Sequence, residues 1–248
     1  CTTGCIVGGV GAVGLRRWQK TDSAAKALAL GLDAHERGDY DEAAVKLGHY
    51  ISLHKDNVSV LMKYADAQAK RRPQAIGQAM ETYRIVLRLD DANVQAAKQL
   101  AKYYVEANAA REAELICKRF LSHHPNSEIQ RIYAVALAHL DQHEASLSQL
   151  KSLLEQDPHA VMTYEVLGQL AENYAEKYEN APGQWYDLAV EKNPASAYAR
   201  IMRARYYLKQ GGDTRAIQEL QAAQGMDLTD LDVRLNLAGE MVRAGLLE

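Results

Sequence analysis

The amino-acid sequence predicts an all-α protein, a right-handed superhelical solenoid of helix-turn-helix repeats. Small residues recur at successive spacings of 34, 36, 33, 34, 36 and 34 residues, at Gly31, Ala65, Ala101, Ala134, Gly168, Ala204 and Ala238. The chain is rich in alanine, and its five prolines fall at turns, a composition that favours helices over strands. A period of this length indicates stacked hairpins, because one short helical hairpin cannot bury its apolar faces alone.

Residues 37–44 show how one hairpin is specified. Gly38 can take the positive φ that ends a helix, and Asp39 can accept hydrogen bonds from the free N–H groups of the next helix. Asp41 and Glu42 then suit the positive end of that second helix. The stretch therefore predicts a helix end, a tight turn and a new helix start.

Close helix packing explains the small residues. A second set follows the first by 12 or 14 residues, at Ala43, Ala79, Ala113, Ser146 and Ala216. Only Gly, Ala or Ser lets two helix backbones come together, and larger residues fill the flanking spaces. We expect this packing role for Leu47, Tyr83, Cys117, Leu150, Tyr186 and Leu220.

At these residues the chain resembles the tetratricopeptide repeat family, whose unit of about 34 residues is a helix-turn-helix with the same alternation. The family's turn and second-helix start are matched by Arg37-Gly38-Asp39-Tyr40 with Ala43 and by Gln210-Gly211-Gly212-Asp213 with Ala216, and its unit-ending proline by Pro125, Pro158 and Pro194. Units two and five depart from the pattern by two extra residues each, around Arg71-Arg72-Pro73 and Ala181-Pro182-Gly183. The resemblance implies the fold but no fixed activity.

The pattern divides the chain into two parts. Residues 24–248 form an array of six units and a partial seventh, with units at 24–57, 58–93, 94–126, 127–160, 161–196 and 197–230 and the seventh starting at Leu231. We expect Leu235, Ala238 and Val242 to share one face of this last helix. The chain stops there without a partner helix, so we expect truncation.

Residues 1–20 are an apolar, glycine-rich segment with a basic flank. Residues 1–15 carry no charge, and Arg16, Arg17 and Lys20 follow abruptly. This arrangement predicts the tail of a single-pass membrane anchor, with the repeats on one side. Two alternatives stay open: a lipoprotein attached through Cys1, or a soluble protein with a glycine-rich leader.

Composition and motifs argue against an enzyme and against a cofactor. A net charge of −3 is too weak to attract a polyanion, so nucleic acid is not an expected partner. The GxGxxG string at residues 9–14 lacks the βαβ context of a dinucleotide site. His139 and His143 stand one turn apart without a third ligand, so we expect surface histidines and no metal. Cys117 is expected to be a buried apolar residue.

Function is therefore expected on the concave surface, which the resemblance assigns to one stripe of each unit's first helix. Positions three before and one after the small residue should face this groove: Leu28, Leu32, Met62 and Asp66 in units one and two, then Lys98, Lys102, Arg131 and Val135, then Glu165, Gln169, Ile201 and Arg205. The three cations predict a site for an acidic segment or a chain-terminal carboxylate, and a solvated face is the alternative.

The sequence thus predicts a membrane-tethered, non-catalytic scaffold whose concave groove binds protein or peptide segments. The alternative is that the repeats are the regulatory or docking region of a larger enzyme truncated at Glu248. Repeats of this kind carry no chemistry of their own, so the sequence does not choose between the two.

Overall fold

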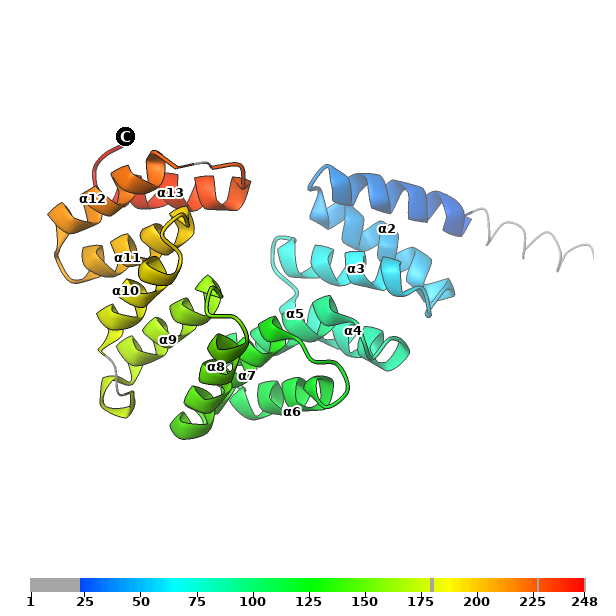
Figure 1. Cartoon of the computed structure of the whole chain (residues 1–248). Helices are drawn as coiled ribbons and strands as arrows, with labels where there is room; N and C mark the ends of the chain where they lie inside the picture. Colours follow the sequence, from blue (N-terminus) through cyan, green and yellow to red (C-terminus); the bar gives the residue numbers. More distant parts are fainter. Residues whose placement is uncertain (1–22, 179–180, 227, 248) are drawn as a thin grey trace, which may run out of the picture. The chain divides into compact units, whose positions relative to one another are not determined.

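The computed structural model describes residues 23–178, 181–226 and 228–247. Within these ranges the chain is built of α-helices and one short 3-10 helix, with no strand (Figure 1). The predicted all-α class and the helix-turn-helix repeats are confirmed. Within each of its compact parts, consecutive helices pack against one another.

The described residues divide into two compact units. One unit comprises residues up to Ala107 with Arg119–His124, and the other comprises Asn108–Lys118 and the chain from Pro125 onward. The first unit contains a helix at residues 23–36 and the helices α2 (Tyr40–Leu53), α3 (Val58–Lys70), α4 (Ile76–Leu89) and α5 (Val94–Glu106). The helix α6 (Ala110–Leu121) contributes residues to both units.

The second unit contains the remaining helices. They are α7 (Ser127–His139), α8 (His143–Gln156), α9 (Val161–Asn173), η1 (Ala175–Lys177), α10 (Pro182–Lys192), α11 (Ala197–Lys209), α12 (Asp213–Gln224) and α13 (Leu231–Arg243). The pairs α7 and α8, α9 and α10, and α11 and α12 pack against each other as hairpins, and α13 packs on α11 and α12.

The first helices of five repeats begin with a side-chain cap, whereas Ala160 before α9 provides none. The side chain of Asn57 accepts a hydrogen bond from the Val60 N–H at 3.2 Å. Equivalent side-chain caps precede α5, α7, α11 and α13, at Asn93, Asn126, Ser196 and Asp230. These oxygens satisfy N–H groups that have no partner inside the helix, and so fix where each helix starts.

A residue with positive φ follows the first helix in five repeats of the described chain. It lies seven residues after the small residue each time, at Gly38 (φ 77°), Asn108 (56°), Asp141 (59°), Gly211 (71°) and Gly245 (69°). Asparagine and aspartate tolerate this conformation better than other side chains, so they replace glycine in two of these turns.

The described residues of repeats two and five show no such turn, and these are the two repeats with extra residues. In repeat two the connection runs from Lys70 to Ile76. In repeat five α9 ends at Asn173 and η1 follows, while Pro182 and Gly183 already belong to α10. Proline suits this first helical position because its missing N–H would have no partner there.

The small residues mark the closest helix contacts, as expected. A Cβ atom on Gly168 would lie 2.4 Å from Cζ of Tyr186, and one on Gly31 would lie 2.7 Å from Cδ2 of Leu47. Each glycine thus lies against the bulky residue of the second helix of its own hairpin. Cys117 is fully buried, and this burial raises the pKa of its thiol to about 12, so it behaves as an apolar core residue.

The predicted single-pass membrane anchor needs correction. Across the described ranges, no helix combines the length and the apolar character needed to cross a bilayer. On this finding the prediction is wrong, and the segment for which it was made, residues 1–20, lies outside the described residues.

Candidate functional site

The residues expected to line the groove fall on the first helices of both units. Lys98 is half-buried and Lys102 exposed on α5, in the first unit. Arg131 on α7, Glu165 and Gln169 on α9, and Arg205 on α11 all belong to the second unit. The structure connects Glu165, Gln169 and Arg205 directly, whereas the convergence of Lys98, Lys102 and Arg131 stays a prediction.

Glu165, Gln169 and Arg205 belong to a cluster of polar and charged side chains, and Glu165 contacts both of the others. Its side chain is only 11% exposed and accepts a hydrogen bond from the Tyr198 hydroxyl at 2.9 Å. The Gln169 amide and the Arg205 guanidinium both reach Oε1 of Glu165 at 3.4 Å. A carboxylate this far from water needs such partners, because an unpaired buried charge is strongly unfavourable.

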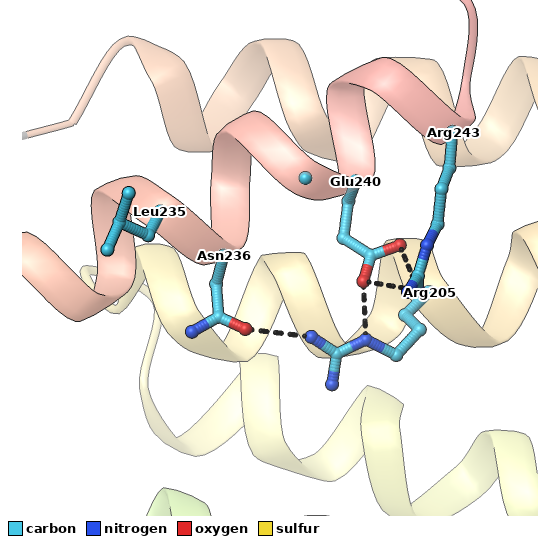
Figure 2. Close-up of a pocket in the computed structure, with 6 residues that line it drawn as sticks. Arg205, Leu235, Asn236, Glu240 and Arg243 are labelled. Atoms are coloured by element: carbon cyan, nitrogen blue, oxygen red, sulfur yellow. Dashed lines mark hydrogen bonds and ion pairs between the residues drawn. The ribbon is translucent and has the colours of Figure 1, made fainter. Parts of the chain in front are cut away.

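Arg205 links Glu165 on α9 to α13. Its Nε donates to Oε1 of Glu240 at 2.7 Å, and its Nη2 donates to Oδ1 of Asn236 at 3.0 Å (Figure 2). Burial lowers the pKa of Arg205, but the hydrogen bond and charge of Glu240 and the charge of Glu165 more than offset it, and the net pKa is raised. The guanidinium is therefore fully charged between two carboxylates.

Glu240 and Arg243 complete the cluster on α13. The Glu240 side chain is only 5% exposed, and Nη1 of Arg243 lies 3.0 Å and 3.3 Å from its two oxygens. Arg243 itself is 68% exposed. A cavity of about 520 Å³ opens here, lined by Arg205, Leu235, Asn236, Gly239, Glu240 and Arg243. Figure 2 shows both arginines joined to the Glu240 carboxylate by dashed lines.

The charge of Glu165 also acts on the pKa values of Arg131 and Tyr198. Burial lowers the pKa of Arg131, and the charges of Glu128 and Glu165 act in the opposite direction. Burial raises the pKa of Tyr198 to about 12, helped by the charge of Glu165 and the hydrogen bond to it. Basic and acidic side chains thus alternate along the first helices of the second unit, at Arg131, Glu165, Arg205 and Glu240.

This cluster can bind and orient a polar group, because guanidinium groups offer more N–H donors than Glu165, Asn236 and Glu240 occupy. The sequence rule for groove positions found Glu165, Gln169 and Arg205. Extended to the seventh repeat, the same rule gives Leu235 and Gly239, both of which line the cavity. The rule missed Asn236, Glu240 and Arg243, since they stand at other positions of α13.

Only one of the two histidines of the fourth hairpin lies at the surface as expected. His139 is exposed at the end of α7, but His143 is 9% exposed and its ring lies 4.7 Å from that of Tyr174. Its burial follows from the turn, which directs the first residue of α8 toward the 174–178 segment. Among the described residues, no group of three His, Cys, Asp or Glu side chains converges as a metal site would require.

Comparisons with protein-family models and with curated protein sequences find no match. Solved structures do match. A tetratricopeptide repeat protein from Parabacteroides merdae is 16% identical over 91% of this chain and 88% of its own, with a TM-score of 0.59. The C-terminal part of a TPR repeat-containing protein from Cytophaga hutchinsonii is 15% identical over 93% of this chain and 94% of its own, with a TM-score of 0.58. MamA from Desulfovibrio magneticus is 15% identical over 71% and 97%, also with a TM-score of 0.58.

These likenesses concern the fold, and they agree with the helix pairs and the turn spacing described above. The chain is an all-α protein of stacked helical hairpins. More particularly, it has the tetratricopeptide-repeat fold.

Proposed function

We propose that the protein is a non-catalytic scaffold that binds protein or peptide segments along α9, α11 and α13. The observation that carries this proposal is the cavity of about 520 Å³ between Arg205 and Arg243. It combines an apolar wall at Leu235 with charged groups held by their neighbours, and such a mixture suits a ligand that must be both buried and oriented.

The arrangement of charges supports binding rather than catalysis. Glu165 and Glu240 both accept hydrogen bonds from Arg205, so their oxygens hold a neighbouring guanidinium in place. A preorganised cluster of this kind lowers the entropic cost of binding, because its side chains are already ordered before the ligand arrives.

Site-specific photo-cross-linking tests the proposal. Gly239 is exposed at the cavity, and a Cβ atom there would meet no atom within 4 Å, so a benzophenone amino acid can replace it without a clash. We expect irradiation in native extract to join a defined set of partner peptides to residue 239. Removal of the exposed guanidinium in an Arg243→Ala variant should reduce the yield of the same cross-links.

Gly77 on α4 provides the matched control, since it is equally exposed and equally free of neighbours. The same probe at residue 77 should give a different and weaker set of cross-links. Identical products at positions 77 and 239, insensitive to Arg243→Ala, would contradict the proposal.

The acidic character of the partner rests on Lys98, Lys102 and Arg131. We propose that these cations favour segments with acidic side chains, because charge-assisted contacts strengthen where water is partly excluded. Lys102 is the exposed member of the set and the one whose replacement disturbs the fold least.

A further inference from the structure

The last residue of α3 is a lysine whose ammonium group lies between a carboxylate and an aromatic ring. Nζ of Lys70 is 3.0 Å from Oδ2 of Asp66 and 5.2 Å from the centre of the Tyr40 ring. Burial lowers the pKa of Lys70, but the hydrogen bond and charge of Asp66 more than offset it, and the net pKa is raised. Asp66 and Tyr40 together therefore favour a positive charge at this point of the first unit.

The groups around this charge are held in place by the fold and do not depend on Lys70. Nε2 of His35 donates to Oδ2 of Asp66 at 2.8 Å, and the two side chains are 17% and 32% exposed. The ring of Tyr40 meets the His35 ring edge-on at 5.6 Å and packs against a cluster of buried alanines. Asp66 and Tyr40 thus stay ordered when the ammonium group leaves, which lowers the entropic cost of binding another cation.

Lys70 itself is held weakly. Its side chain is 51% exposed, and its partner Asp66 stands four residues earlier on the same helix. Such exposed pairs contribute little, because solvent screens the charges and a long side chain loses conformational freedom. Both contacts of Asp66 use Oδ2, and its Oδ1 accepts no hydrogen bond from any residue that the structure describes. A different cation can therefore replace Lys70 at little cost and gain a second oxygen.

The neighbouring turn is strongly acidic. Residues 33–42 include His35, which contacts Asp66, and carry five carboxylates and one arginine. Arg37 pairs with two of these carboxylates, at 3.0 Å and 3.3 Å. Glu36 is exposed and pairs with none of the described residues. The excess of negative charge beside Asp66 attracts a basic ligand.

We propose that His35, Tyr40 and Asp66 form a binding site for an arginine side chain of a partner protein, which displaces Lys70 from Asp66. Arginine suits this site better than lysine, because its planar guanidinium donates to both carboxylate oxygens at once and stacks on an aromatic ring. Lys70 then acts as an internal competitor that lowers the apparent affinity for the partner. This arginine site lies within the first unit and goes beyond the scaffold function proposed for α9, α11 and α13.

A titration followed by nuclear magnetic resonance tests the arginine site. The probe is the capped tripeptide acetyl-Gly-Arg-Gly-amide, added to the full chain with isotope-labelled tyrosine and histidine rings. We expect saturable shifts of the Tyr40 and His35 ring signals. The same peptide with lysine should bind more weakly, and the peptide with citrulline, which has nearly the shape of arginine but no charge, should cause no saturable shift.

The internal competitor provides the decisive variant. Lys70→Gln should raise the affinity for the arginine peptide about threefold to fivefold, because Asp66 is no longer occupied. Lys55→Gln is the matched control, since it removes the same charge from an exposed lysine in the loop at the other end of α3 and should leave the affinity nearly unchanged. Asp66→Asn should weaken binding about tenfold. Circular dichroism verifies that each variant keeps its helix content.

Several outcomes would overturn the proposal. They are the absence of saturable shifts at Tyr40 and His35, and a lysine or citrulline peptide that binds as well as the arginine peptide. Equal gains in Lys70→Gln and Lys55→Gln would show that the peptide responds only to net charge. Because the arginine site shares no residue with the cavity of the second unit, failure here and failure of cross-linking at residue 239 are separate results.

Discussion

The two units differ in how the first helices of their repeats hold charged side chains. In the first unit, Asp66 on α3 is 32% exposed and meets His35 at 2.8 Å and Lys70 at 3.0 Å, with Lys70 itself 51% exposed. In the second unit, the Glu165 and Glu240 side chains are 11% and 5% exposed and share Arg205. The ion pairs have similar lengths, but the Asp66 carboxylate is partly exposed whereas those of Glu165 and Glu240 are buried.

This difference determines which set stabilises the fold. An exposed pair gains little because solvent screens it, whereas a buried pair becomes strongly unfavourable when one member is removed. The groove positions of the first unit, which include the half-buried Leu28, Leu32 and Met62, are more apolar. The second unit therefore places charged side chains where they hold α9, α11 and α13 together.

Removal of the shared cation should have the largest effect on stability. Arg205→Met leaves Glu165 and Glu240 without their common partner, and we expect a loss of about 2 to 3 kcal/mol. Lys70→Met removes the exposed cation of the first unit and should cost less than about 1 kcal/mol. Urea unfolding followed by circular dichroism measures both. Equal losses in the two variants would contradict the comparison.

Close helix contacts should rank next. In Gly168→Ala the new methyl group meets the ring of Tyr186, which cannot easily move, and we expect a loss of about 1 to 3 kcal/mol. Gly31→Ala would meet Cδ2 of the buried Leu47 at 2.7 Å and its backbone N at 3.0 Å, contacts less close than the 2.4 Å at Gly168, so its loss should be somewhat smaller. Gly239→Ala meets no atom and should stabilise α13 by about 0.5 kcal/mol. Thermal melting of the three variants gives the order, and a harmless Gly168→Ala would show that the contact is wrong.

An alkaline titration should expose the buried cluster specifically. Tyr198 has a pKa of about 12 in the folded chain, and an unfolded tyrosine has about 10. A raised folded pKa of a neutral acid contributes stability below pH 10, and this contribution is lost as the pH rises toward 12. The stability difference between the parent and Tyr198→Phe should therefore shrink across this window. A stability difference between the two proteins that stays constant from pH 9 to pH 12 would contradict the raised pKa of Tyr198.

The sequence predicted the hairpins well, because their signals are local. The first helices of repeats two to seven begin at Val58, Val94, Ser127, Val161, Ala197 and Leu231, where the pattern starts each new repeat. Caps and turn residues act within a few positions, so periodicity alone finds them. The division into two compact units was not foreseen, and the description of residues 24–248 as one array stays a prediction.

The candidate site was predicted only in part, because its contacts are not local. Arg205 and Glu240 are 35 residues apart, and their ion pair depends on side-chain conformations that periodicity does not specify. Glu240 stands among apolar residues of α13, where a carboxylate needs a partner. That signal was present in the sequence, but it did not identify Arg205 as the partner.

The substitution with the smallest expected effect on stability tests whether the first unit takes part in binding. Lys102→Glu changes an exposed residue of α5, so the melting temperature should stay nearly constant. Arg131 is a poor choice for reversal, because Glu128 and Glu165 already lie near it and a third carboxylate would destabilise α7. If an acidic partner segment reaches the first unit, Lys102→Glu should weaken binding of the cross-linked partner about fivefold to tenfold. Isothermal titration with that partner compares Lys102→Glu with Arg243→Ala. Loss only in Arg243→Ala would confine recognition to the second unit and leave Lys102 on a solvated face.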